Sequence, residues 1–232
     1  MKTKVLDQPG ELGRSGFAGF TLVELLVVIT IISILSAIAV PAFQNVIESG
    51  RQTRALAHAK QIASGIRAYA MDSGGQFPIG KNQYGQEINT ANDAFRDLVP
   101  DYLEDERIFA IAGSGWGPRA DNRMDGVGEV LESGENHFAY IAGLGDASKN
   151  WWPLIVDGTT GSGVYTREEG VRGGRWKGKR AVVVNVDGSA SVTRLKGEST
   201  RRYIPRVDDE RMNALNVEAY MPEGVQLLEP AG

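Results

Sequence analysis

The chain has 232 residues and a formal net charge of −4. A net negative charge does not indicate the excess of basic residues that nucleic-acid binding usually requires. Because the sequence has no cysteine, disulfide bonds, thiolate catalysis and metal sites with thiolate ligands are excluded. Glycine is frequent, at 29 residues, and most of it follows residue 74, which predicts a C-terminal region rich in turns.

A polar segment, residues 1–19, precedes a long apolar run. This run, Phe20 to Phe43, is 24 residues long, within the roughly 17–25 residues that a helix needs to cross a bilayer. It is too long for the apolar part of a secretory signal, whose cleavage site would also follow it. Basic residues before the run predict a cytoplasmic N-terminus, with the rest of the chain on the other side of the membrane. These residues are Lys2, Lys4 and Arg14.

Glu24 is the one charged residue in the apolar run. A carboxylate in a membrane helix is costly and is by default a functional-site hypothesis. Cleavage before Phe20 would create a free amine four residues from Glu24, within reach on the next turn or on a neighbouring subunit. The alternative is that Glu24 merely reaches the cytoplasmic interface from a shallow position. Near the end of the run, Pro41 predicts a kink, because it lacks an N–H and crowds the preceding turn.

The ten residues from Gly19 to Val28, GFTLVELLVV, resemble the signature shared by type IV prepilins and type II secretion pseudopilins. Pro41 matches the helix-kinking proline of that family, and the resemblance covers roughly residues 14–73. It implies that a membrane aspartyl prepilin peptidase cuts between Gly19 and Phe20 and that the new Phe20 amine is N-methylated. It also implies that Glu24 pairs with the N-terminal amine of the adjacent subunit during assembly.

Beyond Pro41 the sequence becomes amphipathic, which predicts a stem helix over residues 43–73 with its apolar stripe packed on a globular head. The stripe consists of Leu56, Ala59, Ile62 or Ala63, Ile66 and Tyr69. The helix is expected to stop at Ser73-Gly74-Gly75. His58, on this stem, is expected to face solvent. The segment Tyr69 to Pro78 is similar to the end of the stem in pseudopilins.

The head is predicted over residues 74–200, with a small antiparallel sheet. We expect a short helix at 92–102 and strands at 108–111, 137–141 and 152–158. The two runs of 181–195 flank Asp187-Gly188 and predict a hairpin. Gly113 to Glu135 is expected to be a long loop. Residues 201–232 are predicted to form a polar tail with a short helix near 208–217 and no core role.

The predicted organisation is therefore a leader (1–19), a transmembrane helix (20–42), an amphipathic stem (43–73), a head (74–200) and a tail (201–232). This is an α+β fold of the pilin-like kind, in which a long N-terminal helix packs on a small antiparallel sheet.

No residue pattern in the head predicts a metal or catalytic site. Calcium is the one candidate ion, yet the acidic residues that could hold it form no ordered calcium loop. These candidates are Asp146, Asp157, Asp187, Asp208 and Asp209. Asp157 and Asp187 precede glycine and are expected to form turns. The charge run Glu104 to Arg107 is expected on the surface. No nucleophile motif, P-loop or dinucleotide fingerprint is present, so no cofactor and no enzymatic activity are predicted.

The resemblance implies a structural subunit of a type II secretion pseudopilus or a type IV pilus-like filament. It would sit in the bacterial inner membrane as a single-pass protein, with a cytoplasmic N-terminus and a periplasmic head, before extraction into a filament that could reach the cell surface. Its partners would be further copies, other pseudopilins, prepilin peptidase, the inner-membrane assembly platform and membrane lipid, with no nucleic acid.

Two alternatives stay open. One is a minor pilin that acts as an adhesin or a DNA-binding tip module, through the basic segment Arg172 to Arg180 around Trp176. The tryptophans Trp116, Trp151 and Trp152 are a second candidate surface, for sugar or protein, and would equally suit a core role. The other alternative is a membrane-anchored enzyme.

Overall fold

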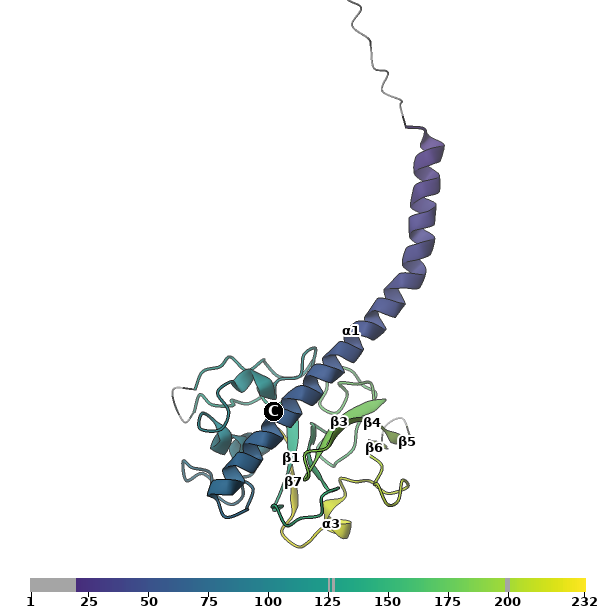
Figure 1. The fold of residues 1–232 in the computed structure, drawn as a ribbon. Coiled ribbons are helices and arrows are strands. Elements are labelled where there is room, and N and C mark those ends of the chain that lie inside the picture. Colours follow the sequence, from purple (N-terminus) through teal and green to yellow (C-terminus); the bar gives the residue numbers. More distant parts are fainter. Residues whose placement is uncertain (1–19, 125, 127, 199–200) are drawn as a thin grey trace, which may run out of the picture. The chain divides into compact units, whose positions relative to one another are not determined.

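A computed structural model describes residues 20–124, 126, 128–198 and 201–232. The chain divides into two compact units between Val46 and Ile47, and the helix α1 (Leu22–Asp72) runs through both. The second unit combines helices with a five-stranded antiparallel sheet, so the predicted α+β architecture is confirmed (Figure 1).

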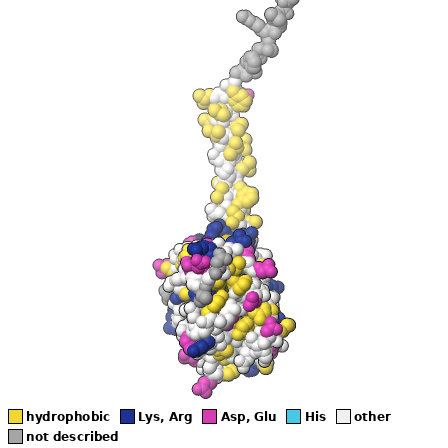
Figure 2. All heavy atoms as spheres, turned by 90° about the vertical axis from the view of Figure 1, so that its left-hand side faces the viewer, with side chains coloured by type: hydrophobic (Ala, Val, Ile, Leu, Met, Phe, Trp, Pro, Cys, Tyr) yellow, Lys and Arg dark blue, Asp and Glu magenta, His cyan; other side chains and the backbone are white. Residues whose placement is uncertain are grey.

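In the first unit, α1 exposes apolar side chains on all sides. Every residue from Leu22 to Ile38 is exposed, and the most apolar 18-residue window of the helix has a mean hydropathy of 2.7 (Figure 2). Thr30 and Ser33 donate their hydroxyls to carbonyls four residues earlier, at 2.7 Å each, so their polar groups are satisfied within the helix. Pro41 lies inside α1, and the kink predicted there stays a prediction.

In the second unit, one face of α1 enters the core, as its apolar stripe predicts. The residues of α1 that are buried are Ala55, Ala59, Ile62, Ala63, Gly65, Ile66 and Ala70. Most of these side chains are small, which lets the helix backbone approach its neighbours closely. Gly65 is the closest approach, because a Cβ there would lie 2.9 Å from Cγ of Leu103.

The helix ends at Asp72, where its end was predicted. Gly74 and Gly75 both adopt positive φ, and the Gly75 N–H donates to the carbonyl of Ala70 at 2.8 Å. Glycine tolerates this left-handed backbone without steric cost, so the pair closes the helix with a C-terminal cap.

The sheet has the strand order β4-β3-β2-β1-β7. The predicted strands at 137–141 and 152–158 are confirmed as β1 (Phe138–Ala142) and β2 (Pro153–Asp157). Every residue of these two strands is buried, so both faces of the middle of the sheet are covered.

The predicted hairpin is also confirmed. β3 (Arg180–Asn185) pairs with β4 (Ala190–Arg194) in the register Arg180↔Arg194 to Val184↔Ala190. Gly188 has a φ of +76° in the turn and donates its N–H to the Asn185 carbonyl at 2.8 Å. A separate two-stranded sheet joins β5 (Lys196–Glu198) to β6 (Arg201–Tyr203).

The short helices agree with the sequence only in part. The helix predicted at 92–102 is α2 (Ala91–Phe95) followed by the 3₁₀ helix η1 (Arg96–Leu98), and a capping box of Thr90 and Asp93 starts it. The strand predicted at 108–111 is wrong, because this region forms the 3₁₀ helix η2 (Glu106–Phe109). The described residues of 113–135 contain turns but no helix or strand, as expected of a long loop.

The prediction that residues 201–232 have no core role is wrong. β7 (Gln226–Leu228) pairs with β1 at the edge of the sheet, and Leu215, Val225 and Leu228 are buried. The helix expected near 208–217 is also wrong, since the helix in this region is α3 (Val217–Tyr220). The C-terminal region belongs to the head because its apolar residues complete the core that β1 begins.

Replacing Ile66 with alanine should destabilise the head by about 2–5 kcal/mol, because the fully buried side chain would leave a cavity. The measurement is denaturant unfolding of the detergent-solubilised chain, followed by the fluorescence of the buried residues Trp152 and Trp176. Lys60→Ala, at an exposed position of the same helix, should change the free energy of unfolding by less than about 0.5 kcal/mol. Equal effects of the two substitutions would contradict a core role for this face of α1.

Candidate functional site

The start of α1 holds the residues to which the sequence assigned processing and assembly. Phe20 is 77% exposed, whereas Gly19 lies outside the described residues. Oε2 of Glu24 accepts hydrogen bonds from the backbone N–H of Thr21 at 2.9 Å and from its hydroxyl at 2.7 Å. The Glu24 N–H in turn lies 3.2 Å from the Thr21 hydroxyl oxygen, to which it donates.

These reciprocal bonds form a capping box, in which Thr21 is the N-cap and Glu24 the third residue of the helix. Sequence reasoning missed the role of Thr21. The signal was present, since a threonine three residues before a glutamate at the start of an apolar run is the pattern of this motif. Within the described residues only Oε2 of Glu24 has hydrogen-bond partners, so Oε1 stays available to a donor from another subunit.

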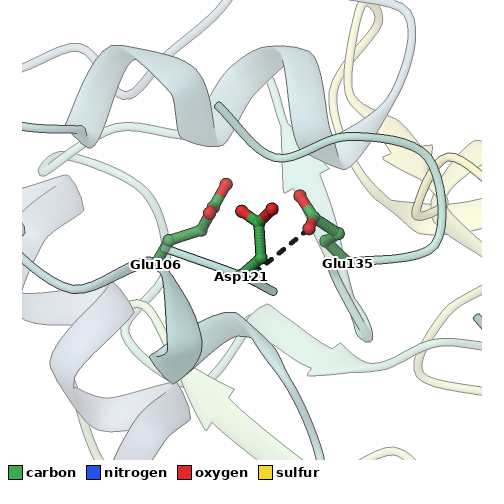
Figure 3. Close-up of side chains that lie close together, drawn as sticks. All are labelled: Glu106, Asp121 and Glu135. Atoms are coloured by element: carbon green, nitrogen blue, oxygen red, sulfur yellow. Dashed lines mark hydrogen bonds between the residues drawn. The ribbon is translucent and has the colours of Figure 1, made fainter. Parts of the chain in front are cut away.

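In the head, three carboxylates meet that the sequence did not connect (Figure 3). Glu106 comes from η2, whereas Asp121 and Glu135 come from the long loop, and one oxygen of each lies within 4.8 Å of the others. Glu106 is fully buried, contrary to the expectation that the charge run of residues 104–107 lies on the surface, whereas Glu104 and Arg107 are exposed as expected. Carboxylate oxygens are the ligands that calcium prefers, so these three residues could hold a divalent cation.

The fold itself already uses these carboxylates. Glu106 accepts the N–H of Leu131 and, at 3.1 Å, the N–H of Asn122, while Glu135 accepts the N–H of Asp121 at 3.2 Å. Burial raises the pKa of Glu106 to about 7, because the N–H donors only partly offset the lost hydration and Glu135 adds repulsion. Burial likewise raises the pKa of Glu135. The cluster therefore ties the long loop to η2 whether or not a cation binds.

The aspartates considered for calcium do not contribute to this cluster. The turn expected at Asp157 is wrong, because this residue ends β2, where it is buried and accepts the Val182 N–H of β3 at 2.8 Å; burial raises its pKa to about 8. Asp187 accepts the Ser189 N–H at 2.8 Å in the hairpin turn, as expected of a turn former. Asp208 pairs with Arg206, Asp209 accepts the Arg211 N–H, and Asp146 lies beside Asp187 in a separate small pocket.

Both histidines contact the backbone of the head. Nδ1 of the buried His137 accepts the Ile111 N–H at 2.8 Å, and Nε2 lies 3.0 Å from the Trp116 carbonyl, to which it donates. Burial lowers the pKa of His137, so a neutral ring with its proton on Nε2 fits both contacts. His58 does not simply face solvent, since it is half-buried with Nδ1 3.3 Å from the Ala110 carbonyl.

The basic segment Arg172 to Arg180 does not form one surface patch. The guanidinium of Arg175 is buried, where it donates to Oε1 of Glu48 at 2.7 Å and stacks on the buried Trp176. Arg172 donates to the Pro230 carbonyl at 2.6 Å. Trp152 is also buried, and Trp116 packs edge-on against His137. Arg175, Trp176 and Trp152 therefore belong to the packed part of the head, whereas Lys177, Lys179 and Arg180 are exposed.

Comparison with known proteins adds one finding. The family model described as the prokaryotic N-terminal methylation motif matches residues 14–40. No curated protein and no solved structure matches the chain significantly. The matched segment contains Phe20, Thr21 and Glu24 and continues through the exposed apolar part of α1.

The raised pKa of Glu106 makes stability depend on pH. Because folded Glu106 binds its proton more tightly than unfolded Glu106, its contribution to stability is full below about pH 4.5 and is lost as the pH rises to about 7. We compare the free energies of unfolding of the natural chain and of Glu106→Gln at each pH. The natural chain's value minus the variant's value should fall by roughly 1–3 kcal/mol between pH 4.5 and pH 7. Denaturant titrations at several pH values measure it.

Using the difference between two chains removes the contributions of Asp157 and His137, which also titrate with shifted pKa values. If the two stability curves run parallel from pH 4.5 to 7, Glu106 does not carry the proton that the geometry indicates.

Proposed function

This chain belongs to the type IV pilin-like and pseudopilin family, and we propose that it is a structural subunit of a pseudopilus or pilus-like filament. One observation supports the proposal above all others. The matched methylation motif is continuous with a helix whose apolar side chains are exposed over more than four turns and therefore need lipid or other helices around them. Prepilin peptidase would cut between Gly19 and Phe20 and leave the whole helix on the mature subunit.

Before assembly, the subunit would be anchored in the inner membrane by this helix, with its head on the extracytoplasmic side. The basic residues of the leader support that orientation. Extraction into a filament would then replace lipid around α1 with the helices of neighbouring subunits. Because lipid and helix side chains are similarly apolar, packing and polar contacts must favour the filament.

Glu24 is the side chain best suited to fix the register of such helices. Its Oε2 is engaged by Thr21, which holds the carboxylate in one orientation, whereas Oε1 has no partner within the described chain. A methylated Phe20 amine from an adjacent subunit would supply the missing donor and the opposite charge. A charge pair in an apolar surrounding is weakly screened, so a misplaced register would leave a costly unpaired carboxylate.

Two substitutions separate the charge of Glu24 from its capping role. Glu24→Gln removes the charge but keeps an oxygen for the capping box, whereas Thr21→Ala removes the cap and keeps the charge. We expect Glu24→Gln to be cleaved and membrane-inserted but to lower filament yield by at least tenfold, with a much smaller loss in Thr21→Ala. Electron microscopy and sheared-fraction blots measure the yield. Normal filaments from Glu24→Gln would disprove the register role.

Processing is tested separately at Gly19. A leucine there should block cleavage, because the small residue before Phe20 is what the motif presents to the peptidase. In cells that contain the peptidase, the natural chain should lose residues 1–19 and run faster on a gel, while Gly19→Leu keeps its full length. Substitution of Gly16, inside the leader, is the matched control and should leave cleavage intact. If the Gly19→Leu chain also loses its leader and runs as fast as the natural chain, the cleavage assignment is refuted.

A further inference from the structure

Four exposed basic residues lie on α1 and on the β3–β4 pair, near the point where Arg180 contacts Gln52 of α1. We call them the basic collar: Arg54 on α1, Lys179 just before β3, Arg180 at the start of β3 and Arg194 at the end of β4. Nη1 of Arg180 lies 3.2 Å from Oε1 of Gln52, which brings the start of β3 against this part of α1. Lys and Arg side chains are visible in this region in Figure 2.

Two collar residues are placed against each other by the sheet itself. Arg180 and Arg194 are direct partners in the register of β3 and β4. Like charges directly opposite one another on antiparallel strands are unfavourable. Within the described part of the chain, no carboxylate lies within 4 Å of any of the four collar residues. The described fold therefore supplies no counter-charge for the pair.

The nearby acidic residue Glu48 is already shared by two other arginines. Its Oε1 accepts from Arg175 at 2.7 Å, and its Oε2 lies 3.4 Å from Nη1 of Arg51. The single negative charge of Glu48 neutralises only one of the two guanidinium groups, so this group of three residues keeps a net positive charge. This end of the head thus stays electropositive, although the whole chain is acidic.

The position of the collar along α1 indicates what faces it. The apolar run ends at Phe43, and Ile47, four residues later, is the last large exposed apolar residue before the buried stripe begins; Arg54 follows Ile47 by seven residues. At 1.5 Å per residue this is a rise of about 10 Å. The polar headgroup layer is roughly 5–8 Å thick on each side of the hydrocarbon, so the long arginine and lysine side chains can reach its phosphates.

We infer that the basic collar binds anionic phospholipid headgroups of the leaflet from which α1 emerges, so that the head rests on the membrane before assembly. This inference rests on the membrane anchorage proposed above. Clustered arginine and lysine residues beside a membrane helix attract anionic lipid electrostatically, and guanidinium groups bind phosphate in bidentate fashion. The unfavourable Arg180–Arg194 pair would be relieved by one phosphate placed between the two side chains.

The experiment uses the full chain reconstituted in vesicles. Because the sequence has no cysteine, Ser191→Cys on the exposed face of β4 gives a single site for a donor fluorophore. Acceptor-labelled lipid headgroups report how closely the head approaches the surface. Vesicles contain phosphatidylcholine alone or with increasing phosphatidylglycerol. Energy transfer should increase with the anionic lipid and fall again at high salt.

The collar variant combines Arg54→Gln, Arg180→Gln and Arg194→Gln. Each removed charge should weaken binding to the anionic surface about fivefold, so the variant with three removed charges should lose most of the lipid-dependent change in energy transfer. Its matched control, with Lys81, Arg119 and Arg211 changed to glutamine, removes equal charge outside the collar and should behave like the natural chain. Unfolding curves of both variants should match the natural chain.

The outcomes are distinct. Failure of the chain to float with phosphatidylcholine vesicles would contradict the membrane anchorage itself. Insertion without any lipid-dependent transfer, or a control variant as impaired as the collar variant, would overturn the collar inference alone. If transfer between two labelled chains depends on the collar in phosphatidylcholine vesicles, the collar binds a second copy rather than lipid, and the inference is likewise overturned.

Discussion

Burial of one face of α1, from Ala55 to Ala70, is the interaction on which the rest of the head depends. The face is made mainly of alanine with Ile62 and Ile66, and Gly65 admits Leu103 against the backbone. Small residues give the helix little apolar area per turn, so they act by bringing backbones together and letting larger side chains interlock above them. Phe95, Phe109 and Tyr140 pack together in the same core, with ring centroids 5.2 and 5.6 Å from Phe95.

The same helix therefore meets two environments. Residues Leu22 to Ile38 are exposed throughout, whereas residues 55–70 bury one face in the head. The helix is continuous through Pro41, so one secondary-structure element carries both kinds of surface.

The elements that the sequence predicted correctly are those with short-range signals. The hairpin of β3 and β4 follows from Asp187-Gly188 between two β-branched runs, and the end of α1 follows from Gly74-Gly75. β7 escaped prediction because its three residues carry no periodicity of their own. Their partner is β1, more than 80 residues earlier in the chain, and only the assembled core makes Leu228 a buried residue.

The site residues divide in the same way. Phe20 and Glu24 were predictable because the motif is local and ordered, and Thr21 would have been too, from its spacing to Glu24. The cluster of Glu106, Asp121 and Glu135 was not, because its members have no regular spacing in the sequence and meet only when the long loop folds back on η2. The fully buried position of Glu106 depends on Leu131 and Asn122, which the sequence gives no reason to place beside it.

Without disulfides, this loop-rich head relies on buried polar side chains that bind the backbone. The amide of Asn92 donates to the carbonyls of Leu131 and Glu132 at 3.0 Å each and accepts the Ala231 N–H at 3.0 Å, which joins the long loop to the residues after β7. Glu106 likewise binds backbone N–H groups of the long loop, but its side chain is ionisable. Its two N–H donors favour the charged form, but burial and the repulsion from Glu135 outweigh them, so protonation in mild acid stabilises this part of the head. The arginines of the basic collar keep their charge at every physiological pH, so acid strengthens the loop tie without weakening the attraction of the collar to anionic lipid.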